Sequence, residues 1–262
     1  MNVSSEKVIK TIILAGGMGT RLRGVIEDIP KPMAPVGGKP FLEYLLLQLK
    51  KWRSAEVILS VGYKKDIIKS YFGNGSRFGI NISYSEEDRP LGTGGALKKA
   101  ISMTDDHRFI VMNGDSVFDI NFSDFVGYHI SKPGIASMSL AIVKDRRRYG
   151  SVDINDRGVI TGFQKEGLDA PGLINGGIYL IDRDIVSYIP DGQISLEGRI
   201  LPLIQRDNLL YGKIFEAFFL DMGTPEDYLW IGRHPEYLNR ISLPLIGAEN
   251  AEPSAQNDKD KT

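Results

Sequence analysis

The chain has 262 residues, 42% of them hydrophobic, and a formal net charge of −1 at neutral pH. The balanced charge argues against a nucleic-acid-binding or membrane-binding surface, and the absence of cysteine excludes disulfides, thiolate metal sites and a cysteine nucleophile. Residues 1–10 lack a hydrophobic signal core and no run approaches membrane-spanning length. We therefore expect a cytoplasmic protein with neither a nucleic-acid nor a membrane partner.

The first predicted element is a buried strand over residues 8–15, which runs directly into a glycine-rich loop ending at Arg21. Glycines allow a sharp turn and bring backbone N–H groups close to a ligand. With Arg21 and Lys31 nearby, the loop indicates binding of a phosphate chain, although a purely structural turn is the alternative. No lysine closes the loop as in a Walker A motif, and Leu22 replaces the last glycine of a dinucleotide-binding fingerprint.

Strands and helices alternate over the first half of the chain. Further strands are predicted at residues 57–61, 80–84 and 109–112, and helices from about residue 40 to 52, at 64–72 and at 93–101. This alternation predicts an α/β fold with a Rossmann-like, doubly wound and mostly parallel sheet, whose ligands lie at the carboxyl ends of the strands. The glycine loop and Asp115 both follow strands, so we expect them to meet at one edge.

The second half is expected to add antiparallel strands to the same sheet. Strands are predicted at residues 135–143, 151–154, 159–163, 176–181 and 213–219, and helices at 194–205 and 225–238. We expect residues 1–246 to form a single domain. Residues 247–262 are small and polar and are expected to be a disordered tail.

Several motifs, in order along the chain, resemble those of the sugar-1-phosphate nucleotidyltransferases. They are Gly16-Gly17-Met18-Gly19-Thr20-Arg21-Leu22, Pro30-Lys31-Pro32-Met33, Pro90-Leu91-Gly92-Thr93-Gly94-Gly95, Asn113-Gly114-Asp115, Asn175-Gly176-Gly177-Ile178-Tyr179 and Asp221-Met222-Gly223-Thr224-Pro225. The resemblance covers residues 11 to about 230. Within the family the chain is most similar to bacterial guanylyltransferases that act on D-glycero-α-D-manno-heptose 1-phosphate.

The resemblance implies transfer of a nucleoside monophosphate, GMP from GTP, to a sugar 1-phosphate with release of pyrophosphate. Alternatives are a mannose-1-phosphate guanylyltransferase, a uridylyl- or thymidylyltransferase, and, in a different class, a non-catalytic regulator that binds nucleotide sugars. A glycosyltransferase is disfavoured, because Asp115 is followed by Ser116-Val117 rather than completing an Asp-x-Asp motif. Family members with this fold are commonly dimers or tetramers, so a homo-oligomer is compatible with the resemblance.

The expected catalytic residues are Arg21, Lys31 and Asp115. The sugar phosphate brings its own nucleophile, so the protein must align two anions and stabilise the charge at phosphorus. The arginine fork suits two phosphate oxygens at once. Lys31 lies between two prolines that are expected to hold its backbone extended, and the family implies that it contacts phosphate.

Asp115 and Asp221 are the expected ligands of Mg²⁺. Each follows an apolar run, and Mg²⁺ in phosphate-transferring sites takes one or two carboxylates together with phosphate oxygens. The alternative role for each aspartate is a helix cap or a turn.

The nucleotide-binding residues implied by the resemblance are Leu14, Ala15, Gly16, Gly17, Gly19, Thr20, Glu87, Gly92 and Thr93. Guanine presents two N–H donors on its pairing edge, so a carboxylate such as Glu87 suits it better than uracil or thymine. The same acidic segment also fits a solvated loop.

The sugar-binding residues implied by the resemblance are Tyr149, Gly150, Lys165, Asn175 and Gly176. One segment departs from the family pattern, because many relatives have Phe-x-Glu-Lys where this chain has Phe163-Gln164-Lys165-Glu166. A shift of one residue turns a strand side chain to the other face. The sequence therefore leaves open whether Lys165 or Glu166 faces the sugar.

Overall fold

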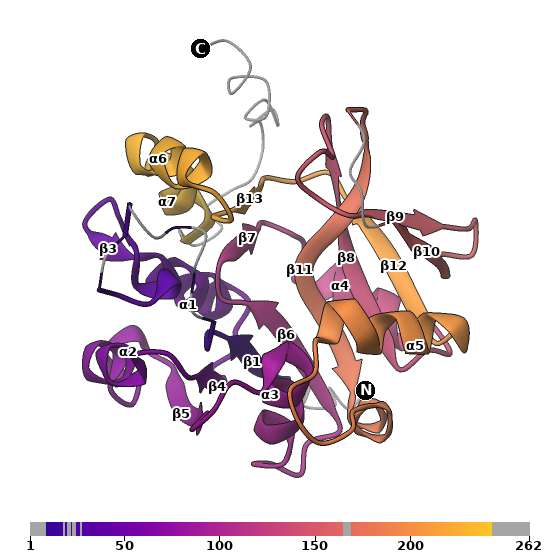
Figure 1. Cartoon of the computed structure of the whole chain (residues 1–262), viewed down its shortest axis with the longest axis horizontal. Coiled ribbons are helices and arrows are strands. Elements are labelled where there is room, and N and C mark those ends of the chain that lie inside the picture. The colour runs from indigo at the N-terminus through magenta and orange to yellow at the C-terminus, as the bar shows by residue number, and fades with distance from the viewer. Residues whose placement is uncertain are drawn as a thin grey trace, which may run out of the picture.

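The computed structural model describes residues 9–17, 19, 22, 25–26, 28–164 and 169–242, and these are built around one nine-stranded mixed sheet (Figure 1). Arg21, Thr20, Lys165, Glu166 and the predicted tail lie outside the described residues. Among the described helices, none is long and apolar enough to cross a membrane.

Strand β1 (Lys10–Leu14) lies at the centre of the parallel part of the sheet. It pairs in parallel with β4 (Glu56–Val61) on one side and with β6 (Arg108–Asn113) on the other, and β4 pairs in parallel with β5 (Asn81–Glu86). The chain thus builds outward from β1 in both directions. Such a reversal of strand order opens a crevice at the carboxyl ends of the two central strands.

The second half of the chain extends the sheet beyond β6. The long strand β11 (Gly172–Asp182) runs antiparallel to β6 and to β8 (Ala136–Val143), and β12 (Leu210–Phe215) pairs in parallel with β8. The hairpin of β9 (Ser151–Ile154) and β10 (Ile160–Gln164) joins through β9 to the first part of β11. The predicted fold class, a mostly parallel sheet with antiparallel additions, is confirmed.

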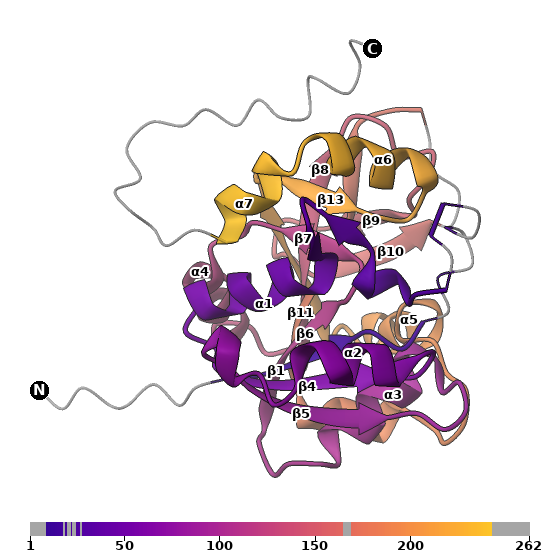
Figure 2. The ribbon, with the colours of Figure 1, turned by 90° about the vertical axis from the view of Figure 1, so that its left-hand side faces the viewer.

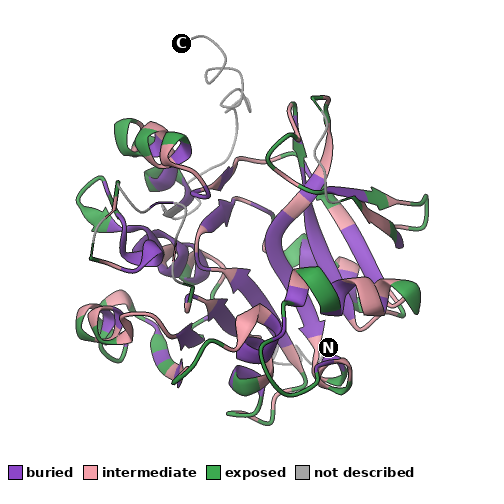
Figure 3. Cartoon of the chain, in the orientation of Figure 1, coloured by how far each residue is buried: buried purple, intermediate pink, exposed green. Residues whose placement is uncertain are grey.

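Helices cover both faces of the sheet. The core on one face receives side chains from α1 (Phe41–Lys51), α2 (Lys65–Phe72), α4 (Phe122–Ile130), α6 (Pro225–Arg233) and α7 (Glu236–Ser242). The core on the other receives them from α3 (Gly92–Ile101), η4 (Arg183–Tyr188), η5 (Leu196–Ile200) and α5 (Leu201–Arg206). Neighbouring residues of β1 divide between the two cores, because Ile12 packs with α3 and Ile13 with α1. Figure 3 shows the central strands buried along most of their length and the helices exposed on their outer sides.

Short elements complete the site end of the sheet. These are η2 (Lys31–Met33), the β2 (Pro35–Val36) and β3 (Lys39–Pro40) hairpin, and a two-stranded sheet of β7 (Ser116–Phe118) with β13 (Phe219–Asp221). The short η3 (Ser76–Phe78) lies at the other end, just before β5. Helix α7 packs against α1, and α6 lies beside β13 (Figure 2).

The C-terminal predictions are wrong in two places. The strand predicted at residues 213–219 is two strands, because the chain leaves β12 after Phe215 and pairs again, with β7, from Phe219. The helix predicted at residues 225–238 is also two. Pro235 disfavours helical backbone at His234, whose φ is −128° and ψ is 51°, and α6 therefore ends at Arg233.

The helix predicted over residues 194–205 begins later than expected. Ile194 is held outside the helix because its N–H donates to the Leu91 carbonyl and its own carbonyl accepts from Gly94. A π-helical turn and then α5 follow it. Helix α4 was missed altogether, although Asn121 caps it by accepting a hydrogen bond from the Asp124 N–H.

Candidate functional site

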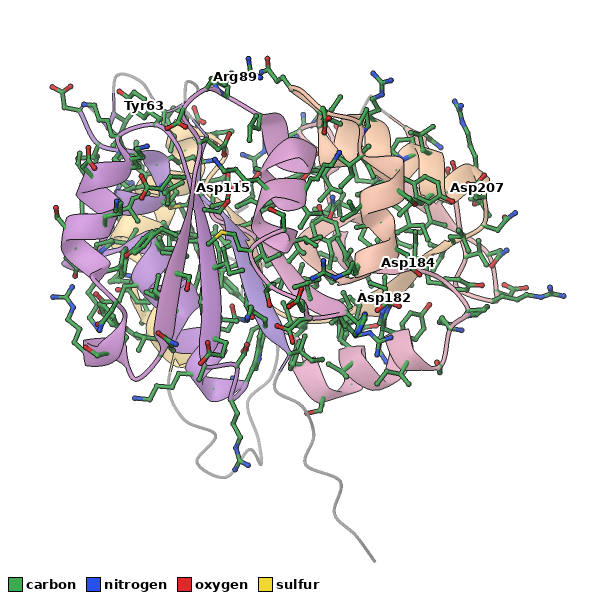
Figure 4. The ribbon with its side chains drawn as sticks, turned by 90° about the horizontal axis from the view of Figure 1, so that it is seen from below. Tyr63, Arg89, Asp115, Asp182, Asp184 and Asp207 are labelled. Atoms are coloured by element: carbon green, nitrogen blue, oxygen red, sulfur yellow. The ribbon has the colours of Figure 1, made fainter. Side chains whose placement is uncertain are left out.

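A cleft of about 720 Å³ opens at the carboxyl ends of β1, β4, β5 and β6. Its position is the one predicted for a ligand at the switch point of a doubly wound sheet. Figure 4 shows Asp115 at the end of the molecule that carries Tyr63 and Arg89, away from Asp182 and Asp207 on the other half. The predicted site residues that line the cleft are Leu14, Ala15, Gly16, Gly17, Gly19, Lys31, Glu87, Gly92, Thr93 and Asp115.

The glycine loop and the Asn113-Gly114-Asp115 segment meet as predicted. The N–H of Gly114 donates to the Leu14 carbonyl at 2.9 Å. A Cβ at Gly16 would lie 2.4 Å from Glu87 Oε1, and one at Gly19, where φ is +59°, would lie 2.8 Å from the Cβ of Lys31. Glycine at these two positions therefore lets the acidic and basic side chains of the cleft pack against the loop backbone.

Lys31 and Asp115 form an ion pair in the floor of the cleft. Lys31 Nζ lies 2.7 Å from Asp115 Oδ2, with the lysine side chain 9% exposed and the aspartate 38%. The backbone at Lys31 is a 3₁₀ turn rather than the extended segment predicted from the prolines, because the Met33 N–H donates back to the Pro30 carbonyl. The lysine is therefore a buried member of the site, not a solvated loop residue.

Asp115 and Asp221 are brought to the same place by the small β7–β13 sheet. Asp221 is opposite Ser116 in the register, and the Met222 N–H donates to the Asp115 carbonyl at 2.9 Å. Among the described residues, no three His, Cys, Asp or Glu side chains could hold a metal together. The structure thus brings the two backbones together, but Asp221 does not line the cleft that Asp115 lines. A Mg²⁺ ion held by these two carboxylates, with water and phosphate oxygens, stays a prediction.

The three consecutive acidic residues that begin at Glu86, the last residue of β5, are divided between two faces. Glu86 pairs with Lys69 and Lys65 of α2, and the hydrogen bonds from Lys69 and Lys65 lower its pKa. Asp88 also pairs with Lys65. Glu87 instead lines the cleft, where its Oε2 accepts from the Leu91 N–H at 2.8 Å. This hydrogen bond holds the Glu87 carboxylate in the cleft wall, and its contact with the base stays a prediction.

Gly92, Gly94 and Gly95 lie in the first turn of α3. The N–H groups of Gly94 and Gly95 donate to the Ile194 carbonyl, and a Cβ at Gly92 would lie 2.5 Å from that oxygen. Glycine is needed here because residues 192–196 pack directly on the helix. Of this motif, Pro90, Gly92 and Thr93 line the cleft, whereas Gly94 and Gly95 do not.

The Asn175-Gly176-Gly177 motif forms a bulge in β11, where the strand changes partner from β9 to β6. Asn175 accepts from the Gly177 N–H at 2.9 Å and donates to the Tyr179 hydroxyl at 2.7 Å. Gly177 has φ +74°, and a Cβ at Gly176 would lie 2.5 Å from the Phe118 ring. The structure therefore gives this motif a backbone role and does not place it in the wall of the cleft.

Tyr149 and Gly150 also lie outside the cleft wall. The Tyr149 ring packs edge-on against Phe219, and its hydroxyl accepts from Arg148 at 3.3 Å. Burial raises the pKa of Tyr149. Arg148 also pairs with the buried Asp227 at the start of α6. This side of the predicted sugar site is thus joined to α6 through one guanidinium group.

Beyond the predicted site residues, the cleft is lined by further polar side chains: Ser60, Tyr63, Asp88, Arg89, Asn113, Gln193 and Glu197. Asn113 belongs to one of the quoted motifs and Arg89 precedes another, so their positions next to the site could have been inferred. Glu197 is 104 residues from Thr93, with which it shares a hydrogen bond. No local pattern marks such a contact.

Comparisons with known proteins agree with the geometry. The family model for nucleotidyl transferases matches residues 10–236. The chain is 41% identical over 221 residues to D-glycero-alpha-D-manno-heptose 1-phosphate guanylyltransferase of Aneurinibacillus thermoaerophilus, covering 84% of this chain and 95% of that one. It is 33% identical over 225 residues to mannose-1-phosphate guanylyltransferase of Mycobacterium tuberculosis, covering 84% and 63%.

A solved structure, HddC from Yersinia pseudotuberculosis complexed with GMP-PN, superposes with a TM-score of 0.77. It is 34% identical, and the match covers 86% of this chain and 99% of that one. The resemblance found in the sequence motifs is thereby confirmed over most of the chain. The chain belongs to the nucleotidyl transferase family.

Proposed function

We propose that this protein transfers GMP from GTP to D-glycero-α-D-manno-heptose 1-phosphate, giving the guanosine diphosphate sugar and pyrophosphate. The observation that carries the proposal is the cleft at the β1–β6 switch point, lined by the glycine loop, Lys31, Asp115 and Glu87. The heptose and the guanine base are proposed from the 41% identical relative named for that reaction.

In the proposed reaction an oxygen of the sugar 1-phosphate attacks the α-phosphorus of GTP. The new P–O bond forms as the bond to the β-phosphate oxygen breaks, and pyrophosphate leaves with that electron pair. The backbone N–H groups of the glycine loop and the Lys31 ammonium group would hold the phosphates. Arg21 is proposed to stabilise charge on the transferring phosphoryl group and on pyrophosphate.

Mg²⁺ is proposed as the cofactor, held by Asp115 and Asp221. When bound it would neutralise charge on the phosphate oxygens and help to align them. Asp115 is bound to Lys31 in this structure. The pair uses Oδ2 of Asp115, and a carboxylate has two oxygens, so Asp115 could hold the metal and keep Lys31 beside the phosphates.

The second candidate is a mannose-1-phosphate guanylyltransferase, which the 33% identical relative from Mycobacterium tuberculosis favours. The two sugars differ by one carbon, and none of the motifs identified in the sequence distinguishes a sugar with that carbon from one without it. A uridylyltransferase remains the alternative for the base, since a glucose-1-phosphate uridylyltransferase from Synechocystis is 34% identical over 238 residues. A non-catalytic regulator is the alternative in another class.

The test is pyrophosphate release with Mg²⁺ and GTP, with heptose 1-phosphate and mannose 1-phosphate offered in parallel and UTP, CTP and dTTP as controls. We expect release with GTP and the heptose, and none after Asp115→Asn in a protein that retains its circular dichroism spectrum. Release with another pair would correct the substrates. No release with any pair from the folded protein would favour the regulator.

We also propose a cytoplasmic location, a single domain over residues 1–246 and self-association into a homo-oligomer. Cell fractionation, limited proteolysis and the molar mass from light scattering test these three statements. A monomer by light scattering at micromolar concentration would contradict the last of them.

A further inference from the structure

Glu197 lies in the cleft wall between the elements predicted to bind the two substrates. Its Oε2 accepts from the Thr93 hydroxyl at 2.7 Å, on the side of the nucleotide loop. Its Oε1 is 3.4 Å from the hydroxyl of Tyr179, which stands on β11 beside Asn175. A contact of 3.4 Å is long for an O–H···O hydrogen bond. Oε1 can therefore accept a further, shorter one.

The Glu197 carboxylate is held in place by several contacts. The Thr93 hydroxyl accepts from the Leu196 N–H at 2.8 Å, so its own proton is free to point at Glu197. Leu196 is fully buried, and the Ser195 side chain caps the turn by accepting from the Gly198 N–H. An acceptor fixed before the ligand arrives loses little conformational entropy on binding.

Asn113 provides a second acceptor in the same cleft. It ends β6 immediately before Gly114-Asp115, and its Oδ1 is buried without a hydrogen-bond partner among the described residues. Buried polar atoms are normally paired, and an unpaired one in a ligand cleft suits a ligand that donates hydrogen bonds. Asn113 also lies next to the Tyr179 hydroxyl, which places it on the side of the cleft that Glu197 faces.

We propose that Glu197 and Asn113 bind a vicinal cis-diol of a substrate sugar. The inference rests on the proposed function, whose two substrates both carry such a diol: the ribose of GTP and the manno-configured ring. A carboxylate oxygen and an amide oxygen accept hydrogen bonds from hydroxyl groups, whereas phosphate offers no donor when ionised. This part of the cleft therefore selects hydroxyls, while Lys31 and the glycine loop bind phosphate.

The test compares Glu197→Gln with the matched control Glu226→Gln, an exposed glutamate in the first turn of α6. For each protein kcat/KM is measured with GTP and its 2′-deoxy and 3′-deoxy analogues, and with mannose 1-phosphate and its 2-deoxy and 3-deoxy analogues. Loss of a hydrogen bond to a charged acceptor should lower kcat/KM about 10- to 100-fold with the hydroxylated substrates. Glu226→Gln should leave every value unchanged.

The analogues identify the diol. In the arm whose sugar contacts Glu197, the deoxy analogue has already lost the hydrogen bond, so Glu197→Gln should change its kcat/KM by less than about threefold. This result with the GTP analogues assigns the diol to the ribose, and with the sugar phosphates to the acceptor sugar. An equal loss with every analogue, or no loss with any substrate, would overturn the proposal and leave Glu197 only the task of tying Thr93 to η5.

Two further measurements separate this proposal from the proposed function. Calorimetric titration compares the affinity of the wild type and of Glu197→Gln for GTP and its deoxy analogues, and it needs no turnover. If the wild type binds GTP but shows no activity, only the proposed function is contradicted. If Glu197→Gln does not fold, the same titrations are made with Asn113→Ala. It should weaken binding of the hydroxylated substrate more than that of the deoxy analogue.

Discussion

The Lys31–Asp115 pair should stabilise the fold asymmetrically. Asp115→Ala leaves a lysine that is 9% exposed without its counter-charge, whereas Lys31→Met leaves an aspartate that is 38% exposed and can be hydrated. Removing one partner of a fully buried pair costs about 3–5 kcal/mol, and exposed pairs contribute about 0–1 kcal/mol. For this half-accessible pair we expect Asp115→Ala to lower the free energy of unfolding by about 2 kcal/mol.

Lys31→Met should cost less than about 1 kcal/mol, because methionine keeps the buried aliphatic stem and removes the charge. The double variant should recover most of the stability that Asp115→Ala loses. Urea unfolding at neutral pH gives the free energy of unfolding of the wild type, the two single variants and the double variant. In thermal unfolding, the melting temperature of Asp115→Ala should lie about 4–8 °C below that of the wild type. If Lys31→Met is the more destabilising of the two single variants, the reasoning from burial is refuted.

Two other predictions concern the backbone and the acid stability of the fold. Gly92→Ala should lower the free energy of unfolding by at least about 2 kcal/mol by urea titration, since φ is +67° and a Cβ would lie 2.5 Å from a backbone oxygen. Gly17→Ala, with nothing within 4 Å, is the control. Burial raises the pKa of Asp182, but hydrogen bonds from His129 and Arg108 outweigh it, so the net pKa is lowered. Its contribution to stability is then present above the unfolded pKa, near 3.8, and lost as pH falls through the folded value. Asp182→Asn should therefore cost more stability at pH 7 than at pH 3, and an equal loss at both would contradict the assignment.

The sequence predicted the parallel half of the fold well, because apolar periodicity and chain order determine it together. Strands β1, β4 and β6 each contain a continuous apolar run, and helix α1 shows one apolar face. The carboxyl-end rule then placed the glycine loop beside Asp115 without any further information. What failed was local. Pro235 divides the last helix, and the residues after Phe215 leave one sheet for another.

The candidate site was predictable where a motif contacts the ligand cleft directly, and not where it supports the backbone. Gly94 and Gly176 belong to motifs that suggested ligand contacts, but the structure uses them to admit a carbonyl group and an aromatic ring. A glycine that contacts a ligand and a glycine that allows close packing look the same in a sequence. Only the neighbours in the folded structure distinguish the two roles. Glu197 could not be predicted because its partners, Thr93 and Tyr179, are joined to it only by folding.

The packing of residues 192–194 on α3 has a consequence for where anions can bind. The N-terminus of a helix ordinarily attracts phosphate, through its free N–H groups and the positive end of the helix dipole. In α3 the Ile194 carbonyl accepts from two of those groups, on Gly94 and Gly95. Two of the four N–H groups in the first turn are thereby satisfied from within the chain. The N-terminus of α3 should therefore attract the triphosphate less than a helix end with four free N–H groups, and less than the glycine loop after β1.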